Sequence, residues 1–167
     1  MKKMTEENVK AALAGESQAH VKYAAFAWKA ETEKLPNIAR AFKANSYAEQ
    51  VHATNYLKTL GALGTTKDNL DAAVGGESFE IDEMYPAYIV TAQSQGEKSA
   101  ETFFNYALAA EKVHAGIYRT AREAVAAGRD LEYKAIHVCS VCGFTMEGAA
   151  PDKCPVCGTA KDKFVAF

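Results

Sequence analysis

The chain has 167 residues, of which 49% are hydrophobic, and a formal net charge of −2 at pH 7. This length fits one domain or a domain with a small appendage, and the apolar content is enough for a hydrophobic core. Without a run of Lys and Arg, neither nucleic acid nor an anionic membrane surface is expected as a partner. Because the chain also lacks the apolar stretch of a signal peptide or of a membrane span, we expect a soluble, cytoplasmic protein.

Two helices joined by a short turn are predicted for the first part of the chain. Helix-forming residues, with apolar side chains at three-and-four spacing, predict helices over 5–32 and 36–63. Pro36 suits the first turn of the second helix. The following residues, 64–77, include several glycines, so they predict a long connection.

Two more helices are predicted beyond this connection. The third covers 78–95 and is expected to kink at Pro86, and the fourth covers 97–127 and ends at Gly128. Two short-looped hairpins joined by a long crossover predict a mainly α fold, a ferritin-like four-helix bundle over residues 1–131.

One eight-residue pattern, Glu-x-x-His-x-x-x-Tyr, occurs in both the second and the fourth predicted helix. The first helix carries a glutamate on its inward face and the third carries two. Ionised carboxylates on inward faces cost many kcal/mol unless a cation compensates them. One Glu from each of two helices, with Glu-x-x-His from the other two, is the ligand set of di-iron and di-manganese carboxylate bundles. The candidate ligands of this two-metal site are Glu16, Glu49, His52, Glu80, Glu83, Glu111 and His114.

Glu83 is one carboxylate more than two ferrous ions require for charge balance, since four glutamates neutralise them. Two ferric ions carry two further positive charges, which a fifth carboxylate and a hydroxo bridge would balance. We therefore expect Glu83 to bind one iron when it is ferric, and His52 to bind that iron when it is ferrous.

All four cysteines lie in the last 29 residues, as Cys139-x-x-Cys142 and Cys154-Pro-x-Cys157. This pattern predicts two turns that hold one tetrahedral ion through four thiolates. Residues 132–167 are too few for a hydrophobic core of their own, so this small four-cysteine metal knot needs its ion to fold. From the spacing alone, zinc is the commoner occupant and iron the redox-active one.

Over essentially its full length the chain resembles rubrerythrin. The resemblance lies in Gly-Glu16-Ser-Gln, Glu49-Gln-Val-His52, Glu80-Ile-Asp-Glu83-Met-Tyr, Glu111-Lys-Val-His114 and the Cys-x-x-Cys pair. It implies a ferritin-like di-iron domain, then a rubredoxin-like domain with one iron on Cys139, Cys142, Cys154 and Cys157. It also implies that the seven candidate residues bind the two irons, that Glu83 exchanges with His52, and that Tyr23 and Tyr88 hydrogen-bond to ligand glutamates.

The activity that the resemblance implies is a peroxidase that reduces hydrogen peroxide to water and protects against oxidative stress. Electrons would come from a rubredoxin or an NAD(P)H-dependent reductase, since the chain has no dinucleotide fingerprint. A head-to-tail homodimer is also implied, with the metal knot of one chain near the di-iron site of the other.

Two other functions fit parts of the sequence. A ferroxidase or iron-storage bundle would use the carboxylates but has no need of the cysteines, and a zinc-ribbon interaction protein would use the cysteines but not the carboxylates. His20, four residues after Glu16, is expected to be a satisfied core or surface histidine and not a ligand.

Overall fold

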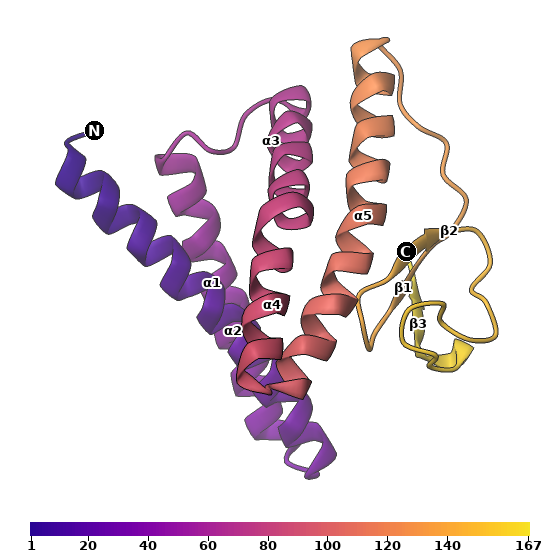
Figure 1. Cartoon of the computed structure of the whole chain (residues 1–167). Coiled ribbons are helices and arrows are strands. Elements are labelled where there is room, and N and C mark those ends of the chain that lie inside the picture. The colour runs from indigo at the N-terminus through magenta and orange to yellow at the C-terminus, as the bar shows by residue number, and fades with distance from the viewer. The chain divides into compact units, whose positions relative to one another are not determined.

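The computed structural model describes residues 1–167 as two compact units, Met1–Gly64 and Thr65–Phe167. Long helices make up the first unit and most of the second, and a small sheet follows them near the C-terminus (Figure 1). None of the helices combines the length and the apolar character that crossing a membrane requires.

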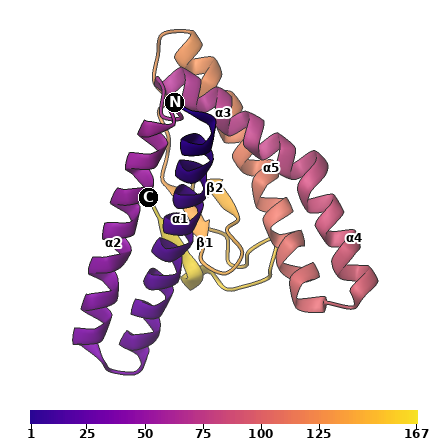
Figure 2. The same ribbon diagram turned by 90° about the vertical axis from the view of Figure 1, so that its left-hand side faces the viewer.

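The first unit is an antiparallel hairpin of α1 (Lys3–Thr32) and α2 (Pro36–Thr59), which Figure 2 shows side by side. Small side chains allow the two backbones to approach closely, and the buried ones are Ala27, Ala30, Ala39, Ser46 and Ala53. Both predicted helices are confirmed. The second ends a few residues before its expected end, because Gly61 has a positive φ of 68° and turns the chain out of the helix.

The second unit begins with a helix where the sequence predicted a connection. Helix α3 (Thr66–Phe79) has Thr65 as its N-cap, and the Thr65 hydroxyl accepts a hydrogen bond from the backbone N–H of Asp68. The Asp68 carboxylate in turn accepts one from the backbone N–H of Thr65 at 3.1 Å. This capping box stabilises the first turn. The prediction of a long connection over 64–77 is therefore wrong.

Helix α3 runs without interruption into η1 (Glu80–Met84), a π-helical segment, and then into α4 (Tyr85–Gln95). Pro86 lies in the first turn of α4. Gly96, with φ of 73°, ends α4, and α5 (Lys98–Ala126) follows. Its predicted end is confirmed, since Gly128 has φ of 70°.

The metal knot contains a three-stranded antiparallel sheet of β1 (Ile136–Cys139), β2 (Thr145–Glu147) and β3 (Phe164–Ala166), in the order β2-β1-β3. The short 3-10 helix η2 (Lys161–Lys163) precedes β3. The fold class, mainly α with a small four-cysteine knot, is confirmed. The predicted domain boundary after residue 131 falls in a segment without helix or strand and stays a prediction, because the compact units divide at Gly64 instead.

The capping box gives a stability prediction. Replacing Thr65 by Ala removes the acceptor of the Asp68 N–H, which costs about 1 kcal/mol. We expect amides in the first turn of α3 to exchange with deuterium about fivefold faster. The control is Thr120→Ala, since Thr120 lies exposed within α5 and caps no helix. Unchanged exchange in Thr65→Ala would show that the cap is not needed.

Candidate metal centres

In the first unit, two carboxylates and a histidine come together between α1 and α2. Oxygen and nitrogen atoms of Glu16, Glu49 and His52 lie within 4.8 Å of one another. His52 Nδ1 is 3.0 Å from Glu49 Oε2 and 3.6 Å from Glu16 Oε1. We call these three residues the first carboxylate cluster. All three were predicted as metal ligands.

The first carboxylate cluster crowds two acids of like charge. A hydrogen bond with Glu49, together with desolvation and the charge of Glu49, raises the pKa of Glu16. Such a pair shares a proton until a cation replaces it. The arrangement therefore fits a metal ion.

Two further residues of this unit are placed outside the cluster. His20 Nδ1 lies 2.8 Å from the backbone oxygen of Ser46, whose hydroxyl donates to the backbone oxygen of His20. His20 is thus a satisfied interhelical histidine, as expected. The ring of Tyr23 packs against Phe26 and Phe42, with ring centroids 6.3 Å apart in both pairs.

A cluster of the same kind lies in the second unit, between α3 and α5. Ligand atoms of Glu77, Glu111 and His114 lie within 4.8 Å of one another. His114 Nδ1 is 2.6 Å from Glu111 Oε2, so the two Glu-x-x-His pairs have similar geometry. Glu80 borders the group: burial and then the charge of Glu111 raise its pKa, while His114 opposes the rise. We call these four residues the second carboxylate cluster.

Glu77 is the member under most electrostatic strain. Burial and interaction with Glu111 raise the pKa of Glu77 to about 7. Its Oε2 atom is buried and has no hydrogen-bond partner. Buried polar atoms in native proteins nearly always have a partner, so this oxygen fits a cation that completes the site.

Glu77 was not among the predicted ligands, and the predicted ligand Glu83 lies outside the second carboxylate cluster. Glu83 is exposed and is not among the residues that could share an ion, although it lies only three positions beyond Glu80. In an α-helix each residue adds a rotation of about 100°, so side chains three positions apart lie on nearly the same face. The π-helical segment between them changes that rotation, so Glu80 joins the cluster and Glu83 does not.

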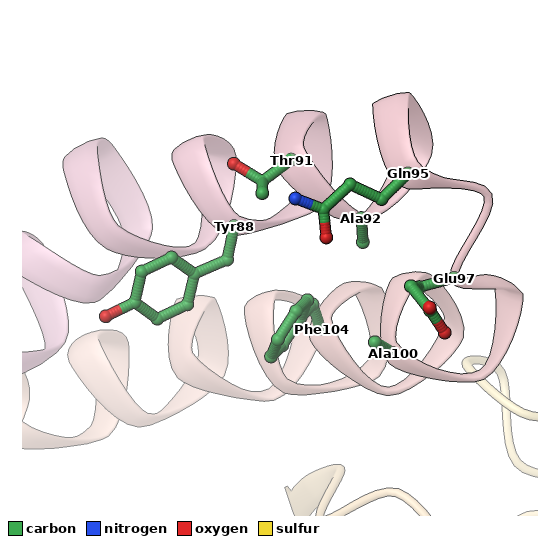
Figure 3. Close-up of a pocket in the computed structure, with 7 residues that line it drawn as sticks. All are labelled: Tyr88, Thr91, Ala92, Gln95, Glu97, Ala100 and Phe104. Carbon is green, nitrogen blue, oxygen red and sulfur yellow. The ribbon is translucent and has the colours of Figure 1, made fainter.

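Tyr88, which was predicted to hydrogen-bond to a ligand glutamate, lies at the surface. Tyr88 is 47% exposed and lines an open groove of about 430 Å³ between α4 and α5. Its ring faces Phe104, with centroids 5.5 Å apart (Figure 3). Tyr85 is the tyrosine beside the carboxylates: burial, and then the charges of Glu111 and Glu80, raise its pKa.

A repeat in the sequence could have identified Glu77. Residues 11–17 read Ala-Ala-Leu-Ala-Gly-Glu-Ser, and residues 72–78 read Ala-Ala-Val-Gly-Gly-Glu-Ser. The repeat pairs Glu16 with Glu77. The distance to the following Glu-x-x-His glutamate is then nearly equal in both halves, 49 − 16 = 33 and 111 − 77 = 34 residues.

The four cysteines form a third candidate metal site, with all four sulfur atoms within 4.8 Å of one another. Cys139 Sγ lies 3.7 Å from Cys157 Sγ, and Cys142 Sγ lies 3.5 Å from Cys154 Sγ. A tetrahedral ion with metal–sulfur bonds of about 2.3 Å requires sulfur separations of about 3.8 Å. The thiols therefore fit one ion.

The backbone around the cysteines favours thiolates unequally. Burial raises the pKa of Cys142. Burial also opposes ionisation of Cys154, but backbone N–H groups of Cys157 and Val156 lower the pKa of Cys154 to about 7. A metal ion would compensate the buried negative charge.

Models of known families match both parts of the chain. The rubrerythrin model matches residues 7–122, and the model for the rubredoxin-like domain of rubrerythrin matches residues 137–165. Rubrerythrin-2 of Clostridium acetobutylicum is 42% identical, over 98% of this chain and 97% of the relative. Nigerythrin of Nitratidesulfovibrio vulgaris is 37% identical, over 98% and 86%.

Among solved structures, nigerythrin in its fully reduced, all-ferrous state is similar to this chain. The match has a TM-score of 0.57 and 35% identity, and covers 98% of this chain and 86% of the other. The mixed-valence state of nigerythrin gives a TM-score of 0.55 with the same identity.

Glu77 and Glu83 can be distinguished by metal binding. Glu77→Gln removes a ligand candidate from the second carboxylate cluster, whereas Glu83→Gln changes an exposed carboxylate nearby. We expect Glu77→Gln to lower zinc affinity roughly tenfold or more, since even partners of ligands have effects of this size. Glu83→Gln should bind zinc as the wild type does. Competition with a chromophoric chelator measures the zinc affinity of both variants. A loss of affinity in Glu83→Gln but not in Glu77→Gln would favour Glu83 as the ligand instead.

Metal binding at the second carboxylate cluster should weaken in acid. With the pKa of Glu77 at about 7, the metal-free cluster holds a proton below that pH, and the metal must displace it. Zinc affinity should therefore fall as the pH is lowered through 7, by up to about tenfold per pH unit. Glu77→Gln should remove this part of the slope in titrations between about pH 6 and 8. Equal slopes in both proteins would refute the assignment.

Proposed function

The chain belongs to the rubrerythrin family, and on that premise we propose that it is a peroxidase that reduces hydrogen peroxide to water. The observation that carries the proposal is the presence of two carboxylate clusters of one design together with a four-thiol site. The thiol site argues against the alternative, a ferroxidase or iron-storage bundle, because storage needs no electron relay.

We assign the di-iron ligands by cluster. The first carboxylate cluster offers Glu16, Glu49 and His52 as metal ligands, and the second offers Glu77, Glu80, Glu111 and His114. Glu83 is exposed in this structure and stays the residue predicted to exchange with His52.

When bound, the two carboxylate-held irons supply the two electrons that, with two protons, convert hydrogen peroxide to two waters, and the cysteine-held iron returns electrons singly. The residues of the chain would hold the ions and orient the groups around them. Both Glu-x-x-His pairs direct a histidine Nδ1 toward their glutamate. Tyr85 carries its phenolic proton at neutral pH, as any tyrosine does, and its raised pKa extends this to higher pH, so it can donate a hydrogen bond to a neighbouring carboxylate.

The partners remain those expected from the resemblance. We propose a rubredoxin or an NAD(P)H-dependent reductase as electron donor, a homodimer as the assembly and the cytoplasm as the location. Tyr23 and Tyr88 stay predictions as tyrosines that hydrogen-bond to ligand glutamates, and Tyr85 is the tyrosine whose pKa the second carboxylate cluster raises.

Anaerobic stopped-flow spectroscopy tests the proposal. The fully reduced protein is mixed with one equivalent of hydrogen peroxide or of oxygen, and the return of the visible ferric-thiolate band is followed. We expect recovery with peroxide to be at least about tenfold faster, a barrier difference of about 1.4 kcal/mol. Glu111→Gln should abolish the preference, and Thr120→Ala, which changes an exposed residue outside both clusters, should keep it.

Other outcomes of this experiment would refute the peroxidase. Faster oxidation by oxygen than by peroxide would favour the ferroxidase. A protein that shows no visible band would have zinc on the cysteines and would lack the relay on which the proposal depends.

A further inference from the structure

One face of α5 carries three residues that meet the metal knot at four-residue spacing, Tyr106, Ala110 and His114. Tyr106 packs against the buried cysteines. A Cβ atom at Gly143 would lie 4.0 Å from the Cβ of Ala110, so the turn after Cys142 approaches the helix closely. One turn further along, His114 Nε2 lies 2.8 Å from the hydroxyl oxygen of Thr145, the first residue of β2.

The hydrogen bonds of Thr145 determine which nitrogen of His114 carries a proton. The Thr145 hydroxyl donates its single proton to the backbone oxygen of Gly143 at 3.0 Å. It must therefore accept at its other contact, so His114 Nε2 donates. A proton on Nε2 leaves Nδ1, which is hydrogen-bonded to Glu111 Oε2 at 2.6 Å, as the nitrogen that can give its lone pair to an ion in place of that hydrogen bond.

From this geometry we propose that Thr145 is a positioning residue for the metal ligand His114. It fixes the ring with Nδ1 directed into the second carboxylate cluster. Its own hydroxyl is oriented by the backbone oxygen of Gly143, the residue that follows Cys142. This inference rests on the proposed function only for the identity of the metal ligands.

The environment of Thr145 makes the contact hard to replace. Thr145 is 8% exposed, and its strand position opposite Val138 fixes its backbone. If the hydroxyl were lost, His114 Nε2 would be left in a half-buried site without its partner. Partners that orient metal-binding histidines contribute about 10- to 100-fold to metal affinity.

The test measures zinc binding to the full-length protein with iron retained on its cysteines and the carboxylate sites emptied. We expect Thr145→Val to lower zinc affinity about tenfold or more, while the visible ferric-thiolate band is unchanged. Thr145→Ser keeps the hydroxyl and should restore wild-type affinity. Thr120→Val is the matched control, because Thr120 lies on α5 and bonds only the backbone oxygen of Gly116.

Wild-type affinity in Thr145→Val would overturn the inference, and so would an equal loss in Thr145→Ser and Thr145→Val. If Thr145→Val loses the visible band, the inference is tested on the zinc-loaded wild-type protein by NMR instead. Long-range ¹H–¹⁵N spectra should show a slowly exchanging proton on His114 Nε2, and its absence would refute the contact. None of these measurements uses peroxide, so failure of the peroxidase proposal would leave their outcome unaffected.

Discussion

Half-buried carboxylates of like charge are the constraint on which the rest of this structure depends. In each unit a glutamate from one helix is held against a Glu-x-x-His pair from another. The hydrogen bond with Glu49 and desolvation raise the pKa of Glu16, while burial and then the interaction with Glu111 raise the pKa of Glu77. Without a cation this arrangement keeps protons that the acids would otherwise release, and it leaves Glu77 Oε2 unpaired. The helices are therefore arranged for a ligand that the chain itself does not contain.

Much of the fold and part of the site follow from local spacing. The helices α1, α2 and α5, the Glu-x-x-His pairs and the four cysteines could be predicted because each depends on residues a few positions apart. Five of the seven predicted ligands come together, Glu16, Glu49 and His52 in one cluster and Glu111 and His114 in the other. In such cases the helical period is enough to bring the side chains to one face.

The second carboxylate cluster was harder to predict because two local signals misled. The glycines at 75 and 76 suggested a loop, but the capping box at Thr65 begins a helix that includes them. The π-helical segment interrupts the 3.6-residue period at Glu80–Met84, so helical spacing could not place the residues that follow Glu80. The contact between His114 and Thr145 joins residues 31 positions apart and leaves no periodic signal at all.

The π-helical segment also limits how this chain can change length. An insertion or deletion of one residue in a regular helix rotates everything beyond it by about 100°. A π-helical turn holds about one residue more than an α-helical turn, and Glu80–Met84 accommodates that residue. Helices α3 and α4, on either side of it, both contact α5. Shortening this segment by one residue would give a more regular helix, yet it would turn Tyr85 away from the acids while leaving Glu77 in place. The irregularity is thus what lets one continuous helix serve two differently oriented faces.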